Sequence, residues 1–129
     1  MPKNNIKVLV AEDDKFLVKA FAVKLAKDGF DVIVAGNGNE AIAEAKKNKP
    51  DIILLDLIMP QKNGFDALYE LKQDEETKDI PVIITSNLSQ EIDIKRGKDL
   101  GADDYLVKSD TPIQEIIAKI KQVLAKRKK

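Results

Sequence analysis

The fold is decided by the stretch Asp51-Ile52-Ile53-Leu54-Leu55-Asp56, in which four large apolar residues run directly into a carboxylate. An earlier stretch, Ile6-Lys7-Val8-Leu9-Val10-Ala11-Glu12-Asp13-Asp14, repeats the pattern and ends in three acidic residues. Short apolar runs of this kind are typical of strands that are buried on both faces of a parallel sheet. The acidic side chains would then lie at the carboxyl edge of the sheet, where open α/β sheets bind their ligands.

Further apolar runs alternate with segments of helical pattern along the whole chain. The predicted strands are 6–11, 31–35, 51–55, 80–85 and 104–107, and the predicted helices are 15–27, 39–47, 64–73, 88–98 and 111–126. This alternation implies a parallel sheet covered by helices on both faces, and right-handed crossovers leave few ways to order the strands. We therefore predict an α/β, flavodoxin-like (βα)5 doubly wound sandwich with strand order 2-1-3-4-5.

Several local signals support the predicted helix boundaries. Asp14 has the position of an N-cap, Gly29 follows the first helix, and Thr111-Pro112 has the pattern of an N-cap followed by proline. The pairs Asn37-Gly38 and Asn63-Gly64 predict turns.

Length and composition predict one soluble domain. The 129 residues are expected to form a single unit with a core of about 6–125 and a frayed basic tail, 126–129. The 22 basic and 22 acidic residues balance, which argues against general binding to nucleic acid or to a membrane surface. There is no cysteine, no histidine and no apolar segment long enough to span a bilayer, so a cytoplasmic protein that works with carboxylates, hydroxyls and lysine is expected.

The acidic residues at the two strand ends predict a metal site. In the predicted strand order, Glu12 and Asp13 lie beside Asp56, and the carboxylates would repel one another unless a cation were bound. Mg²⁺ suits such a site because it takes oxygen ligands and bridges to phosphate. Asp56 could then act as a nucleophile that forms an acyl phosphate. The alternative, a favourable interaction of acidic residues with a helix N-terminus, is preferred for Asp14 only.

Two further strand ends carry candidate partners for a phosphoryl group. Ser86 could donate a hydrogen bond to a phosphoryl oxygen or could cap the next helix, and spacing alone leaves Thr85 as a competing hydroxyl. Lys108 could neutralise charge at the same edge, although a solvated lysine is the commoner case.

Taken together, these residues resemble the receiver domains of two-component response regulators, including the single-domain chemotaxis type. The resemblance covers about residues 6–125 and rests on landmarks in a fixed order, namely 8–14, 51–60, Asn63-Gly64, 81–87 and 101–108. Each landmark alone is weak, but the set is highly specific. The family has the same strand order, so the two arguments for that order are not independent.

The resemblance implies a role for each candidate residue. Asp56 would accept a phosphoryl group from a phosphohistidine of a sensor histidine kinase or a phosphotransfer protein. Mg²⁺ would be bound by Glu12, Asp13, Asp56 and the backbone carbonyl of Ile58. Lys108 would contact phosphoryl oxygens. The resemblance also favours Ser86 over Thr85: Ser86 would move toward the phosphoryl group and Tyr105 would rotate inward. Such a protein assists its own phosphorylation without being an enzyme in the ordinary sense.

The chain departs from the family pattern at three positions. Ser109 replaces the proline that commonly follows the lysine, which puts the usual cis peptide in doubt. Glu12 replaces the more common aspartate and reaches farther. Asn87 stands where a small residue is frequent, and its bulk would oppose the switch movement.

Two apolar residues predict a long-lived phosphoryl group. Ile58 and Leu88 stand two residues after the acceptor and the hydroxyl, positions that line the path of the hydrolytic water in this family. Neither side chain can orient water by a hydrogen bond, and both can exclude it.

Three other classes of protein share part of this pattern. Phosphatases of the haloacid dehalogenase type need an aspartate where Ile58 stands, and they usually carry a cap domain. A flavin or nucleotide module would bring a phosphate next to Glu12 and Asp13, which would repel it. A receiver-like module that signals by binding alone remains the main alternative. In the family, output often runs through the face formed by the fourth helix, fifth strand and fifth helix, as a monomer or a phosphorylation-dependent dimer. The kinase and downstream partner are not identified by the sequence.

Overall fold

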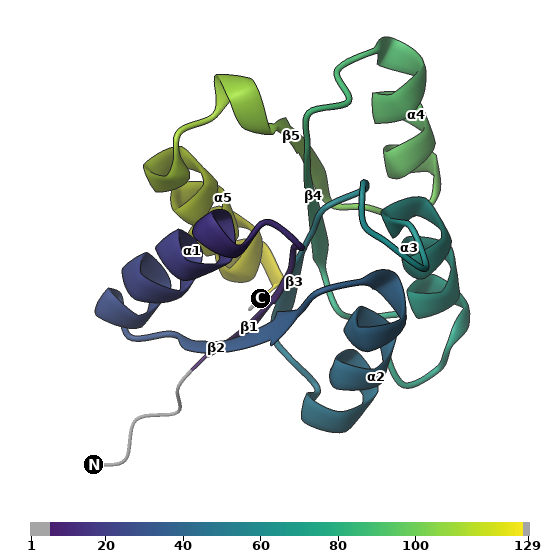
Figure 1. Ribbon diagram of the computed structural model, residues 1–129. Helices are drawn as coiled ribbons and strands as arrows, with labels where there is room; N and C mark the ends of the chain where they lie inside the picture. Colours follow the sequence, from purple (N-terminus) through teal and green to yellow (C-terminus); the bar gives the residue numbers. More distant parts are fainter. Residues whose placement is uncertain (1–5, 128–129) are drawn as a thin grey trace.

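A computed structural model describes residues 6–127 and contains a five-stranded parallel sheet between two layers of helices (Figure 1). The strands are β1 (Lys7–Ala11), β2 (Asp31–Ala35), β3 (Ile52–Leu55), β4 (Val82–Ser86) and β5 (Asp104–Val107). The helices are α1 (Lys15–Lys27), α2 (Gly38–Asn48), α3 (Gly64–Gln73), α4 (Glu91–Asp99) and α5 (Ile113–Arg127). The order β2-β1-β3-β4-β5, with every neighbouring pair parallel, confirms the predicted topology.

The central strand β3 explains why the sheet needs two helical layers. All four of its residues are buried, and successive side chains point to opposite faces. Ile53 and Leu55 belong to the core cluster that includes residues of α2 and α3. Ile52 and Leu54 belong to the cluster that includes residues of α1 and α5. The apolar run Ile52–Leu55 is therefore one strand with two buried faces.

The N-cap predicted for the first helix is confirmed, and two residues predicted only as turns are also caps. Asp14 caps α1, because its side chain accepts hydrogen bonds from the backbone N–H groups of Phe16 and Leu17. Asn37 and Asn63, predicted only as turn residues, cap α2 and α3 in the same way. The turns at these positions are thus helix N-termini.

Close contact between α3 and β3 depends on a glycine. The N–H of Gly64, the first residue of α3, donates to the carbonyl of Leu57 at 2.9 Å. A β-carbon on Gly64 would overlap the Asp56 carbonyl oxygen and lie 2.6 Å from the Leu57 α-carbon. The neighbouring atoms are backbone and have little room to move. Only glycine therefore lets α3 start this close to the end of β3.

Some predicted boundaries were wrong. The fourth helix begins at Glu91 rather than at residue 88, so Ser86 does not cap it, and the residue before it, Gln90, makes no side-chain capping bond. A 3₁₀ turn, Lys108–Asp110, precedes α5, and Thr111 donates its hydroxyl proton to the Val107 carbonyl at 2.8 Å.

The basic tail, 126–129, was predicted to be frayed. Of the basic tail, 126–127 continue α5, whereas 128–129 lie outside the described residues.

Candidate functional site

Backbone hydrogen bonds carry the sheet pattern past the ends of the central strands. The N–H of Glu12 donates to the carbonyl of Ala35 at 2.9 Å, and the N–H of Asp56 donates to the carbonyl of Ala11 at 3.0 Å. Because β1 and β3 are parallel neighbours, the two acidic residues emerge side by side at the carboxyl edge. The sequence prediction that this edge collects acidic residues is confirmed.

Glu12, Asp13 and Asp56 form one cluster. Each offers a carboxylate oxygen, and the three oxygens lie within 4.8 Å of one another. Glu12 and Asp56 are both only 3% exposed, whereas Asp13 faces solvent. The cluster therefore joins two buried carboxylates to one that is open to water.

Lys108 reaches into this cluster from the turn after β5. Its Nζ lies 2.7 Å from Glu12 Oε1 and 3.3 Å from Asp56 Oδ2. Burial lowers the pKa of Lys108, but the hydrogen bond to Glu12 and the charges of Asp56 and Glu12 outweigh it and raise that pKa above its ordinary value. The ammonium stays charged, and it balances only one of three carboxylates.

The carboxyl group of Asp56 is held in an unfavourable electrostatic setting. Burial, followed by the negative charge of Glu12, raises the pKa of Asp56 to about 6. Lys108 and the N–H of Ile58, which donates to Asp56 Oδ1 at 3.3 Å, oppose the increase without cancelling it. A raised pKa with a named charge partner in a cleft is typical of functional sites.

The donor set fits a hard divalent cation. Three carboxylates against one ammonium leave an excess of negative charge, and an exposed member of the cluster gives access from solvent. A hollow of about 470 Å³ on this side of the sheet includes Glu12 and Asp13 in its lining. Mg²⁺ accepts one or two carboxylates and keeps several waters, which matches this arrangement.

Ser86 ends β4, the strand on the other side of β3. Strand alternation places it on the same face as Ile84, whereas Thr85 points to the opposite face. The Ser86 hydroxyl oxygen accepts a hydrogen bond from the Leu88 N–H at 3.2 Å. The structure thus brings Glu12, Asp13, Asp56 and Lys108 together and holds Ser86 one strand away, within its own loop.

Tyr105 lies inside the protein next to this loop. Its side chain is 7% exposed, and its hydroxyl donates to the Leu88 carbonyl at 2.7 Å. Burial raises the pKa of Tyr105, and a hydrogen bond with Ser86 works in the opposite direction. The ring fits because residue 97 of α4 is glycine: a β-carbon there would lie 3.1 Å from the ring and 2.6 Å from Ile84 Cδ1.

Sequence reasoning missed Gly97. A glycine within a predicted helix was the available signal, because glycine is unfavourable in a helix interior unless close packing requires it.

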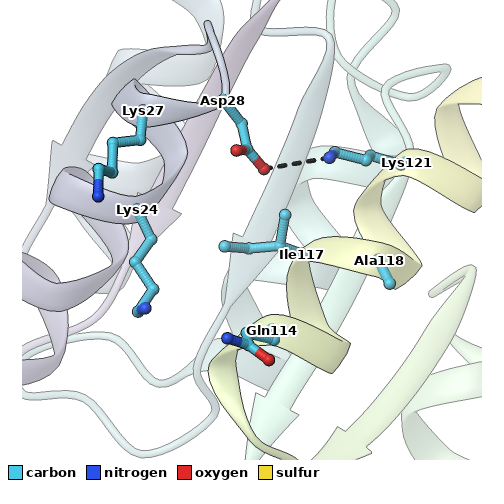
Figure 2. A pocket seen from close by; sticks show the side chains of 7 residues that line it. All are labelled: Lys24, Lys27, Asp28, Gln114, Ile117, Ala118 and Lys121. Atoms are coloured by element: carbon cyan, nitrogen blue, oxygen red, sulfur yellow. Dashed lines mark ion pairs between the residues drawn. The ribbon is translucent and has the colours of Figure 1, made fainter.

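A separate cleft lies between α1 and α5, away from the carboxylates. Figure 2 shows Lys24, Lys27 and Gln114 around it, with Ile117 between the helices and an ion pair from Lys121 to Asp28 of 3.1 Å. Its volume is about 290 Å³. None of the site residues predicted from the sequence lines this cleft.

Comparison with known proteins gives the family. The model of the response regulator receiver domain matches residues 8–121. The chain is 40% identical over 121 residues to the protein PilH of Pseudomonas aeruginosa, covering 92% of this chain and 98% of PilH. It is 35% identical over 120 residues to the transcriptional regulatory protein PhoP of Bacillus subtilis, covering 93% of this chain but 49% of PhoP.

A solved structure supports the same conclusion. The receiver domain of the Francisella response regulator 1452 has a TM-score of 0.86 and 37% identity, with 97% of this chain and 100% of that chain covered.

Fold, acidic pocket and sequence similarity together define a receiver domain of two-component signalling. The chain belongs to the response regulator receiver domain family. Members of this family typically accept a phosphoryl group without being enzymes, and membership implies a histidine kinase as a partner. The cluster of Glu12, Asp13 and Asp56 is typical of the Mg²⁺ site of receivers.

No helix within residues 6–127 is both long and apolar enough to cross a membrane. Within the same range there is no cis peptide bond, so the peptide between Lys108 and Ser109 is trans.

Proposed function

We propose that Asp56 accepts a phosphoryl group from a phosphohistidine of a sensor histidine kinase or a phosphotransfer protein. The observation that supports this most is the burial of the Asp56 carboxylate at the end of β3, flanked by Glu12 and Lys108. In the reaction, an oxygen of Asp56 attacks phosphorus, the P–N bond of the donor breaks, and the imidazole leaves. The product is an acyl phosphate on Asp56.

The residues around Asp56 have distinct parts in this reaction. Glu12, Asp13, Asp56 and the backbone carbonyl of Ile58 would hold Mg²⁺, which would supply positive charge for the phosphoryl oxygens. Lys108, whose ammonium contacts Glu12 and Asp56, contributes a second positive charge. Ser86 donates its hydroxyl proton to a phosphoryl oxygen, while its oxygen is free to accept from the Leu88 N–H.

Phosphorylation is read out by the loop after β4 and by α4. When Ser86 moves toward the phosphoryl group, its loop moves with it, and the bond from Tyr105 to Leu88 joins this loop to β5. Output toward a protein partner runs, as it often does in the family, through a face made of α4, β5 and α5, and α4 carries the largely exposed Ile92. The protein would act in the cytoplasm, as a monomer or a phosphorylation-dependent dimer.

The first test is intact mass after incubation with acetyl phosphate. One phosphoryl group should be added to the wild-type protein in the presence of Mg²⁺ and lost when Mg²⁺ is chelated. The Asp56→Asn variant should gain none, because its amide is a poor nucleophile. Ser89→Ala, an exposed change in the loop after β4, serves as the control and should be phosphorylated like the wild type.

A negative result would favour a different function. If neither acetyl phosphate nor a kinase donor adds mass to the wild-type protein, phosphoacceptor chemistry is absent. A receiver-like module that signals through binding alone would then be the better account.

The phosphoryl group is expected to be long-lived. Ile58 is 60% exposed and Leu88 is half-buried, so each offers an apolar surface beside the route to Asp56. After the donor is removed, loss of the phosphoryl mass should take far longer than seconds. Ile58→Asn should accelerate this loss roughly tenfold, because an amide can hold a water molecule near phosphorus. A wild-type half-life of seconds would contradict the prediction.

A further inference from the structure

One hydrogen bond joins the two loops that carry Ser86 and Lys108. The backbone N–H of Ser109 donates to the side-chain Oδ1 of Asn87 at 3.0 Å. Asn87 follows Ser86 directly, and Ser109 follows Lys108 directly. The bond therefore connects the residues that come immediately after two members of the proposed site.

This bond exists only because residue 109 is not proline. Proline has no backbone N–H and could not donate to Asn87. A small side chain at position 87 would have no acceptor that reaches across to the second loop. Two of the three positions at which the chain departs from the common receiver pattern are thus the two partners of a single bond. The bulk of Asn87 is also accommodated, because its side chain is exposed.

Each partner sits on a short segment that is fixed elsewhere. On the β5 side, the Thr111 hydroxyl bonds to the Val107 carbonyl at 2.8 Å and the Lys108 Nζ bonds to Glu12 at 2.7 Å. On the β4 side, Tyr105 holds the Leu88 carbonyl at 2.7 Å. The bond between Asn87 and Ser109 links these two anchored segments across the carboxyl edge of the sheet.

We infer that Asn87 is a positioning residue, which holds the backbone at Lys108 and Ser109 against the loop of Ser86 and so keeps the lysine and the hydroxyl correctly spaced for phosphoryl transfer. This inference rests on the proposed function. Asn87 acts through Ser109 and touches no reacting atom. The alternative is a surface hydrogen bond that stabilises the two loops without any effect on the reaction.

The test compares variants that break the bond with one that keeps it. Asn87→Ala removes the acceptor and Ser109→Pro removes the donor, whereas Ser109→Ala keeps the backbone donor and is the matched control. The rate of phosphorylation by acetyl phosphate and the dissociation constant for Mg²⁺ are measured for each variant and for the double variant, Asn87→Ala with Ser109→Pro. Exchange of the Ser109 amide proton is followed by NMR in the wild type and in Asn87→Ala.

The expected pattern separates positioning from stability. A neutral hydrogen bond shifts an equilibrium by roughly 2- to 12-fold, so Asn87→Ala should speed amide exchange and slow phosphorylation by roughly 2- to 12-fold. Ser109→Pro should slow phosphorylation to a similar extent, and the double variant should be no slower than either single variant. Ser109→Ala should match the wild type, and the affinity for Mg²⁺ should not change in any of them.

Several results would overturn the inference. Faster amide exchange in Asn87→Ala with an unchanged phosphorylation rate would leave only a structural hydrogen bond. Equal slowing by Ser109→Ala would show that the side chain, not the backbone donor, matters. If Ser109→Pro does not fold, Asn87→Ala alone decides the case. If the wild type itself takes no phosphoryl group, the proposed function fails too, and amide exchange then reports on the bond alone.

Discussion

Replacing Gly64 by alanine is expected to lower the free energy of unfolding by about 3 kcal/mol, the upper range for overpacking a buried site. The added methyl group would overlap the Asp56 carbonyl oxygen and lie 2.6 Å from the Leu57 α-carbon. Neither atom belongs to a flexible side chain, so α3 and the end of β3 must separate. Alanine is a better helix former than glycine, and helix propensity therefore favours the opposite sign. Urea unfolding measures the difference.

Gly36→Ala is the matched control for this experiment. The nearest atom to a β-carbon at position 36 is Glu40 Oε1 at 3.5 Å, an ordinary contact with a side chain. This variant should stay within about 0.5 kcal/mol of the wild type. Gly64→Ala should also slow phosphorylation by acetyl phosphate, since the displaced backbone carries Asp56. A stable and fully reactive Gly64→Ala would show that α3 is not tightly seated on the phosphoacceptor strand.

In the absence of divalent cations, the protein should become more stable as the pH falls from 7.5 to 5. The pKa of Asp56 is raised from 3.8 to about 6 in the folded state. The folded protein therefore binds this proton more tightly than the unfolded chain, and the stabilisation is complete below the unfolded pKa and lost as the pH rises through about 6. Between pH 7.5 and 5 the gain in unfolding free energy should be about 1 kcal/mol.

The Asp56→Asn variant should remove this dependence. An amide keeps the volume of the side chain without its charge, so the variant should be more stable than the wild type at pH 7.5 by about 2 kcal/mol in a chelating buffer. Asp13→Asn, a change of the exposed carboxylate in the same cluster, should have a smaller effect because water already solvates that group. Urea unfolding at the two pH values, with chelator and with Mg²⁺, provides the measurement.

Two outcomes would argue against a strained carboxylate cluster. One is a loss of stability in Asp56→Asn without Mg²⁺, and the other is an unchanged pH dependence in that variant. Saturating Mg²⁺ should weaken the wild-type pH dependence, since a bound cation favours the ionised carboxylates.

Much of the fold could be predicted because its signals are local. A run such as 52–55 is typical of a strand that is buried on both faces of a parallel sheet, and the alternation of strands and helices then restricts the topology. The cluster of Glu12, Asp13 and Asp56 could be predicted by the same reasoning, because neighbouring parallel strands have their carboxyl ends at the same edge of the sheet. The N-cap at Asp14 was predictable because capping depends on neighbours two and three residues away.

The predicted start of the fourth helix was wrong in the loop where the chain leaves β4. Residues 88–90 were expected to form the start of a helix, but α4 starts at Glu91. The intervening loop uses its backbone groups for other partners: the Leu88 N–H bonds to Ser86, and the Leu88 carbonyl bonds to Tyr105. Tyr105 lies 17 positions from Leu88 in the sequence, so no local sequence pattern predicts this hydrogen bond.

The strands, their order and the carboxylates at the edge of the sheet could be predicted from the sequence, because burial periodicity and capping act over a few residues. The electrostatic and hydrogen-bonding environment of these groups depends on the folded structure. The raised pKa of Asp56 requires burial beside Glu12, the lysine contact spans 96 positions, and the bond from Ser109 to Asn87 spans 22. These groups are far apart in the sequence and come within a few ångströms of one another only because β3, β4 and β5 pack side by side. Electrostatic and hydrogen-bond energies depend on separation in space and not on separation along the chain.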